Sequence, residues 1–188
     1  MHPDIKALED QFEAVARDYA ALVAGLDEAK GTWRTDPASW SIAECLDHLA
    51  TANRAYLDEM TPAAAAARAQ GRMRRGPATP GFFGRLFAKS LDAPPKSWSK
   101  SAAPRLIKPR PSPAFADASA AFAKAHDDVR GFLQVNADLD LAGITYVNPL
   151  ARRLRPSLAT GLHVIAAHER RHLWQAWNVR RLLIPSSS

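Results

Sequence analysis

Apolar side chains recur at spacings of three and four residues along four long stretches of the chain, the pattern of a helix with one buried face. The pattern predicts helices over residues 3–29, 42–68, 114–135 and 156–184. A capping-box sequence, Ser41 with Glu44 three residues later, starts the second helix, and Pro156 suits the first turn of the fourth. The sequence therefore predicts an all-α protein built on four helices.

The segment between the second and third helices differs in composition from the rest. Residues 71–113 hold most of the prolines, which break regular structure, so we expect a long crossover there. The whole predicts a four-helix bundle forming a single domain over residues 1–185, with a tail at 186–188. Within the crossover we expect a short helix pinned to the bundle, because its large apolar side chains are costly to leave in water: Phe82, Phe83, Leu86, Phe87 and Leu91.

Length and composition restrict the class of protein. A chain of 188 residues with 47% hydrophobic and 23% charged side chains can bury a core without disulfides or a structural metal, so a metal here would point to function. Cys45 is the only cysteine, which excludes an intrachain disulfide. The sequence contains no leader-like apolar stretch near Met1 and no run of 18 apolar residues, so we expect a cytoplasmic protein with no membrane partner.

The formal net charge of +6 is unevenly distributed. Residues 68–110 contain eleven Lys or Arg and one acid, Asp92, a balance of +10, whereas the remaining residues have fourteen bases and eighteen acids, a balance of −4. The crossover bases are interrupted by prolines and aromatics, and no recognised nucleic-acid motif surrounds them. Nucleic acid is therefore a disfavoured partner.

Two histidines on the fourth helix form the clearest candidate site. His168 and His172 lie about 40° apart on one apolar face, one turn from each other, a spacing that suits one metal ion bound by both rings. For a third ligand, His48 and His126 both lie close to apolar helix faces, and geometry alone does not choose between them. Cys45 is either a soft fourth ligand or a small buried apolar side chain.

The same run also matches H-E-x-x-H, the zincin signature with Glu169 as general base. The sixteen residues after His172 contain no His, Asp, Glu or Cys to complete a zincin site. Glu169 is also rotated about 100° from His168, off the apolar face, where pairing with an arginine is its ordinary role. A peptidase is therefore disfavoured, and His2 and His163 are assigned to the surface.

Two segments carry a family resemblance. Residues 40–50 (WSIAECLDHLA) and 165–175 (IAAHERRHLWQ) resemble the W-S-x-x-E-x-x-x-H-L and H-x-x-x-H-x-x-Q segments of the DinB-like superfamily, metal-binding four-helix bundles that include YfiT-like and thiol-dependent S-transferase members. The resemblance implies that His48, His168 and His172 bind a divalent metal, commonly zinc or nickel. It also implies His48 rather than His126 as the third ligand.

Three imidazoles leave a coordination position open, as in catalytic metal sites. The resemblance implies a metal-dependent transferase or hydrolase, in which a low-molecular-weight thiol bound as thiolate attacks a small electrophile. Arg171 is a candidate to hold an anionic group or is simply solvated, and Gln175 to orient a ligand or satisfy a buried polar group. The alternative function is a non-catalytic, stress-associated metal-binding homodimer, and Leu173 and Trp177 lie opposite the histidine face as candidate dimer contacts.

Overall fold

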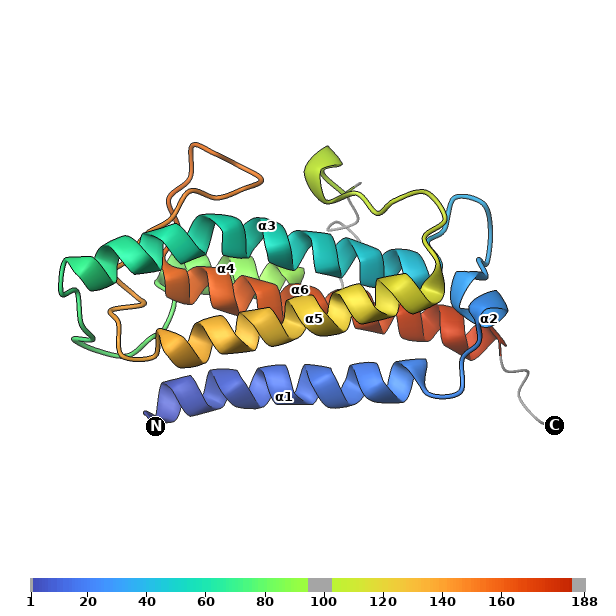
Figure 1. The fold of residues 1–188 in the computed structure, drawn as a ribbon, viewed down its shortest axis with the longest axis horizontal. Coiled ribbons are helices and arrows are strands. Elements are labelled where there is room, and N and C mark those ends of the chain that lie inside the picture. The colour runs from blue at the N-terminus through green and yellow to red at the C-terminus, as the bar shows by residue number, and fades with distance from the viewer. Residues whose placement is uncertain (1, 95–102, 184–188) are drawn as a thin grey trace.

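The computed structural model describes residues 2–94 and 103–183, and Figure 1 shows its fold. The described residues form four long helices, α1 (Pro3–Val23), α3 (Ile42–Ala69), α5 (Phe115–Val135) and α6 (Leu158–Leu183), and three short ones, α2 (Glu28–Thr32), α4 (Phe82–Leu91) and the 3₁₀ turn η2 (Arg105–Ile107).

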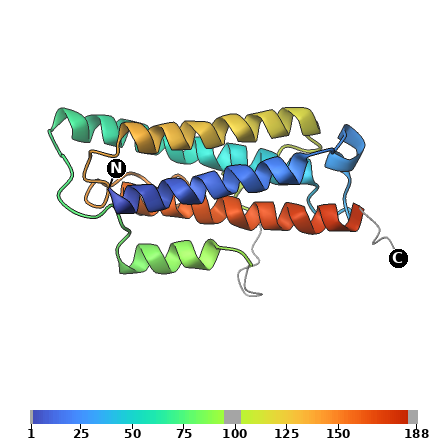
Figure 2. The same cartoon turned by 90° about the horizontal axis from the view of Figure 1, so that it is seen from below.

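The four long helices run side by side along the long axis of the molecule (Figures 1 and 2). Helices α1 and α3 each pack against both α5 and α6, which places α1 diagonally opposite α3. Residues 2–94 and 103–183 contain two isolated β-bridges and no strand, so the predicted all-α bundle is confirmed. None of the helices in these ranges is both long and apolar enough to cross a membrane.

The first predicted helix, residues 3–29, is broken in two, which corrects the sequence-based boundary. Gly25 adopts a φ of +70°, a left-handed conformation that ends the helix. Asp27 then caps α2 by accepting a hydrogen bond of 2.8 Å from a backbone N–H of its first turn. Gly31, expected in a break, belongs to α2 and packs so closely that an added Cβ would lie 2.2 Å from Phe115 Cγ.

The short helix expected in the crossover is present as α4, but of its five large apolar side chains only Leu91 packs on the bundle core as expected. Figure 2 shows α4 outside the bundle alongside α6. It packs on α6 through small residues, because Gly84 lies against Thr160 and Ala88 is buried. Four large side chains face outward instead, with exposed fractions of 67% for Phe82, 81% for Phe83, 59% for Leu86 and 48% for Phe87. Residues 95–102 of the crossover, and the predicted end of the last helix with the tail, fall outside the described residues.

The core consists of two hydrophobic clusters with a polar layer between them. One cluster gathers around Phe12 and Leu133 and the other around Leu46 and Phe122. Between them along the helices lie three buried polar side chains, one each from α3, α5 and α6: Asn53, His126 and Glu169.

Candidate metal centre

Helices α3 and α6 bring three histidines together at their interface. One ring nitrogen from each of His48, His168 and His172 lies within 4.8 Å of the other two. The Nε2 atoms of His48 and His168 are 3.2 Å apart, and the ring centroids of the three pairs are separated by 4.4 to 4.9 Å. The three histidines expected at a common site are therefore neighbours.

The start of α3 fixes the position of His48. Ser41 Oγ accepts a hydrogen bond from the Glu44 backbone N–H, and Glu44 Oε2 accepts one of 2.9 Å from the Ser41 backbone N–H, which forms the predicted capping box. Arg34 donates to the other oxygen of Glu44 over 2.8 Å. The Trp40 ring precedes the helix and covers the cluster, with its centroid 4.9 Å from His48 and 5.7 Å from His172.

The crossover supplies a hydrogen-bond partner to His48. Its Nδ1 lies 2.5 Å from the backbone carbonyl oxygen of Ile107, and only a protonated Nδ1 can make that contact a hydrogen bond. A neutral imidazole that donates from Nδ1 has an unprotonated Nε2, and this nitrogen faces the cluster. The buried carboxylate of Asp47 holds the crossover in place by accepting three hydrogen bonds of 2.6 to 2.8 Å from the backbone and side chain of Arg110.

Gln175 supplies the corresponding hydrogen-bond partner to His172. The side-chain Oε1 of Gln175 lies 3.0 Å from His172 Nδ1 and accepts a hydrogen bond from the N–H there. This leaves Nε2 of His172 as the available ligand atom. The structure therefore places Gln175, a candidate catalytic residue from the sequence, as the partner that orients a histidine. Arg171, the other candidate, directly precedes His172 and is half-buried. Its positive charge helps to lower the pKa of His168.

Burial keeps the three imidazoles neutral. It lowers the pKa of His168 to about 3, and repulsion from His48 and Arg171 adds to that effect. Burial also lowers the pKa of His172 well below its usual value, and it lowers the pKa of His48 even though the hydrogen bond to the Ile107 carbonyl acts in the opposite direction. Neutral imidazole is the form that binds a metal ion, so the cluster is ready to do so near neutral pH.

Two alternative ligands named from the sequence lie elsewhere. His126 is 3% exposed and belongs to the polar layer, where its Nδ1 is 3.0 Å from Glu169 Oε1. Cys45 is fully buried among apolar side chains, which raises the pKa of its thiol and makes it a core residue. Of the groups in the described ranges, the three-histidine cluster alone gathers enough donors for a metal ion.

The expectation that Glu169 pairs with an arginine is wrong. Its carboxylate is fully buried and accepts a hydrogen bond of 2.7 Å from Asn53 as well as contacting His126. A zincin base must instead lie beside the metal, so this geometry also disfavours a peptidase. His163 is half-buried, where a surface position was expected, and His2 is exposed at the start of α1.

The two candidate dimer contacts, Leu173 and Trp177, are engaged within their own chain. Leu173 is fully buried in the core of its own chain, so it offers nothing to a second copy. Trp177 is half-buried and donates from its indole N–H to Asp18 over 2.9 Å.

Three contacts at the site were not predicted from the sequence. The Ile107 carbonyl is a backbone group, the Asp47–Arg110 pair spans 63 positions, and the Trp40 ring covers histidines from two helices. Side-chain periodicity reports which face of a helix is buried, and it carries no information about such contacts.

Comparison with known proteins assigns the chain to a family. A family model of the DinB superfamily matches residues 11–176, a range that includes all three histidines of the cluster, the whole of α3 and most of α6. No curated protein and no solved structure matches the chain. Because the match extends over most of the sequence, the chain belongs to the DinB superfamily.

Proposed function

We propose that this chain binds a divalent metal ion, zinc or nickel, through His48, His168 and His172. The observation that carries the proposal is the gathering of three neutral imidazoles with their ligand atoms within 4.8 Å of one another. Two nitrogens bound to one tetrahedral zinc at about 2.0–2.1 Å lie roughly 3.3 Å apart. The separation of 3.2 Å between Nε2 of His48 and of His168 fits that requirement.

The proposed reaction is the transfer of a small thiol to an electrophilic small molecule. A divalent metal with an open position lowers the pKa of a coordinated thiol and so supplies a thiolate near neutral pH. Burial keeps the three rings neutral, and the hydrogen bonds to Ile107 and Gln175 fix the orientations of the His48 and His172 rings. The Trp40 ring shields one side of the cluster, and the positive charge of Arg171 beside His168 favours an anionic thiol or substrate.

Metal content tests the binding proposal. Purified protein is expected to retain about one zinc or nickel ion per chain by elemental analysis, and His168→Ala is expected to lose most of it. His163→Ala is the matched control, because His163 lies on the same helix and is also half-buried. Equal metal content in the His168→Ala variant and the wild type would exclude this ligand set.

Activity is tested separately, with a panel of low-molecular-weight thiols and electrophiles. We expect conjugation that depends on added metal and that is lost in His168→Ala. An absence of turnover in metal-loaded protein would reject the transferase and favour the non-catalytic metal-binding protein. In that case, size-exclusion chromatography with light scattering tests the homodimer expected for such a protein.

A further inference from the structure

Helix α4 presents an apolar stripe to solvent. At about 100° per residue, Phe82, Leu86, Phe83 and Phe87 follow one another over about 140° of the helix circumference. All four are exposed, with Phe83 at 81%. The opposite side of the helix, with Gly84 and Ala88, is the side packed on α6. The stripe therefore has no partner within the described chain.

Cations border this stripe. Arg85 and Lys89 lie next to Phe82 on the helix circumference, and both are exposed. Neither Arg85 nor Lys89 forms an ion pair with another described residue. The same holds for three exposed cations on the flanking segments, Arg75, Arg105 and Lys108.

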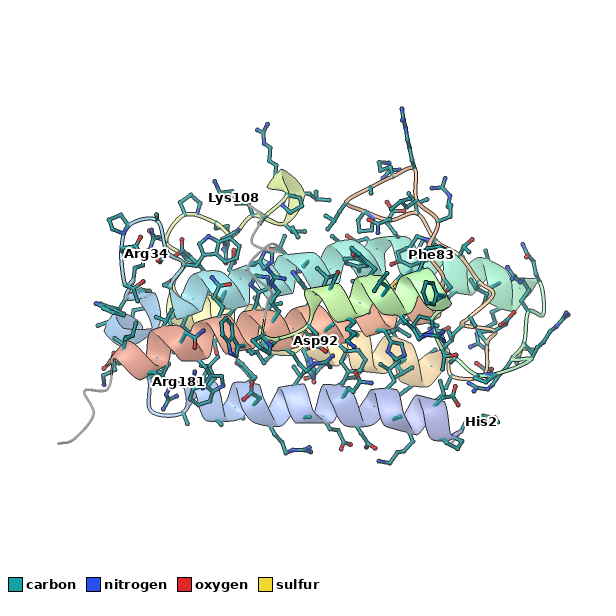
Figure 3. The ribbon with its side chains drawn as sticks, turned by 180° about the vertical axis from the view of Figure 1, so that it is seen from behind. His2, Arg34, Phe83, Asp92, Lys108 and Arg181 are labelled. Atoms are coloured by element: carbon teal, nitrogen blue, oxygen red, sulfur yellow. The ribbon has the colours of Figure 1, made fainter. Side chains whose placement is uncertain are left out.

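The one acid of this segment is already paired. Asp92, the single acid of residues 68–110, follows α4 and accepts two hydrogen bonds of 2.8 Å from Arg170 of α6. Figure 3 shows Phe83 and Asp92 toward opposite ends of α4. The segment that carries the apolar stripe is thus positively charged, and its one carboxylate is turned to the bundle.

We propose that α4 docks this protein on the surface of an anionic lipid bilayer. A helix with large apolar side chains on one face and Arg or Lys beside them lies in the interface, where the apolar groups enter the headgroup boundary and the cations meet lipid phosphates. This chemistry needs no membrane-spanning helix, and it revises the expectation that no membrane takes part.

Two other occupants fit this surface less well. A second copy docked through the same face would bring two strongly cationic segments together, which like-charge repulsion opposes. A nucleic acid would pair with the cations but leave Leu86 and its apolar neighbours in water. Of these three occupants, the anionic bilayer is the one that engages both the apolar side chains and the cations.

Vesicle co-sedimentation tests the proposal with the full-length, metal-loaded protein. Vesicles of mixed phosphatidylglycerol and phosphatidylcholine are expected to bind the wild type, and pure phosphatidylcholine vesicles to bind it at least about tenfold more weakly. The double variant Phe82→Ser with Phe83→Ser is expected to bind the mixed vesicles at least about tenfold more weakly than the wild type. The double variant Arg85→Gln with Lys89→Gln is expected to bind the mixed vesicles about thirtyfold more weakly than the wild type, because each cation near the surface contributes about fivefold to the affinity.

The matched control replaces exposed apolar side chains outside α4. Val135 and Leu154 are 70% and 59% exposed, so Val135→Ser with Leu154→Ser also removes exposed apolar surface, and this variant should bind vesicles like the wild type. Circular dichroism melts establish that each variant is folded. No binding to the mixed vesicles, or equal binding by the phenylalanine variant, would overturn the proposal. A wild-type dimer that the phenylalanine variant loses, without vesicle binding, would assign the face to a second copy instead.

Discussion

Replacement of Gln175 tests whether this residue orients His172 for the proposed metal ion. In Gln175→Leu, the acceptor 3.0 Å from His172 Nδ1 is lost while the side chain keeps a similar volume. His172 is only 9% exposed, so its N–H is left without a partner in a buried position, at a cost of about 1–3 kcal/mol. The ring can avoid that cost by moving its proton to Nε2, which is the atom needed for the metal.

The expected consequence is a loss of metal affinity of about 10- to 100-fold, or about 1.4–2.7 kcal/mol. Gln175→Glu is the matched variant, since a carboxylate accepts the same hydrogen bond with added charge and should retain or raise the affinity. Both affinities are measured by competition with a chromophoric zinc chelator at neutral pH. Wild-type affinity in Gln175→Leu, or an equal loss in both variants, would refute the role assigned to this residue.

Two further predictions concern stability. Burial raises the pKa of Asp4, but hydrogen bonds from Arg74 and a backbone N–H outweigh it and hold the pKa at about 2, so Asp4→Asn should lower the free energy of unfolding by about 2 kcal/mol at pH 7. That contribution is fully present above pH 3.8 and is lost as the pH falls through about 2, so urea melts of both proteins should converge in acid; a constant difference would contradict it. Gly31→Ala should destabilise the fold by about 1–3 kcal/mol through its clash with Phe115, whereas Gly131→Ala, with open space around it, should stabilise α5 by up to about 1 kcal/mol. The same sign for both glycine variants in thermal melts would be inconsistent with this packing.

The helices and the pairing of His168 with His172 were predictable because both depend on which helix face is buried. Helix α3 begins at Ile42 as its capping box indicated, and α5 differs from its prediction by one residue. The choice between His48 and His126 was not predictable from geometry, for a physical reason. Both side chains are buried, one in the cluster and one against Glu169, so both lie near apolar faces.

Helix α4 is the element for which the expected burial of large apolar side chains gave a wrong prediction. A preference for burying large apolar groups predicted that its phenylalanines face the bundle. Gly84 and Ala88 instead allow α4 to approach α6 closely, and the helix turns its large side chains outward. A helix with apolar residues on two sides presents two candidate faces, and the sequence pattern alone does not rank them.

Diffraction from crystals grown with zinc, with data collected on both sides of the zinc absorption edge, tests the metal site most directly. We predict one strong anomalous peak at about 2.0–2.1 Å from a ring nitrogen of each of His48, His168 and His172. The Nδ1 atoms of His48 and His172 should remain hydrogen-bonded to Ile107 and Gln175. A peak held by other residues, or none between the three rings at saturating zinc, would contradict the assignment.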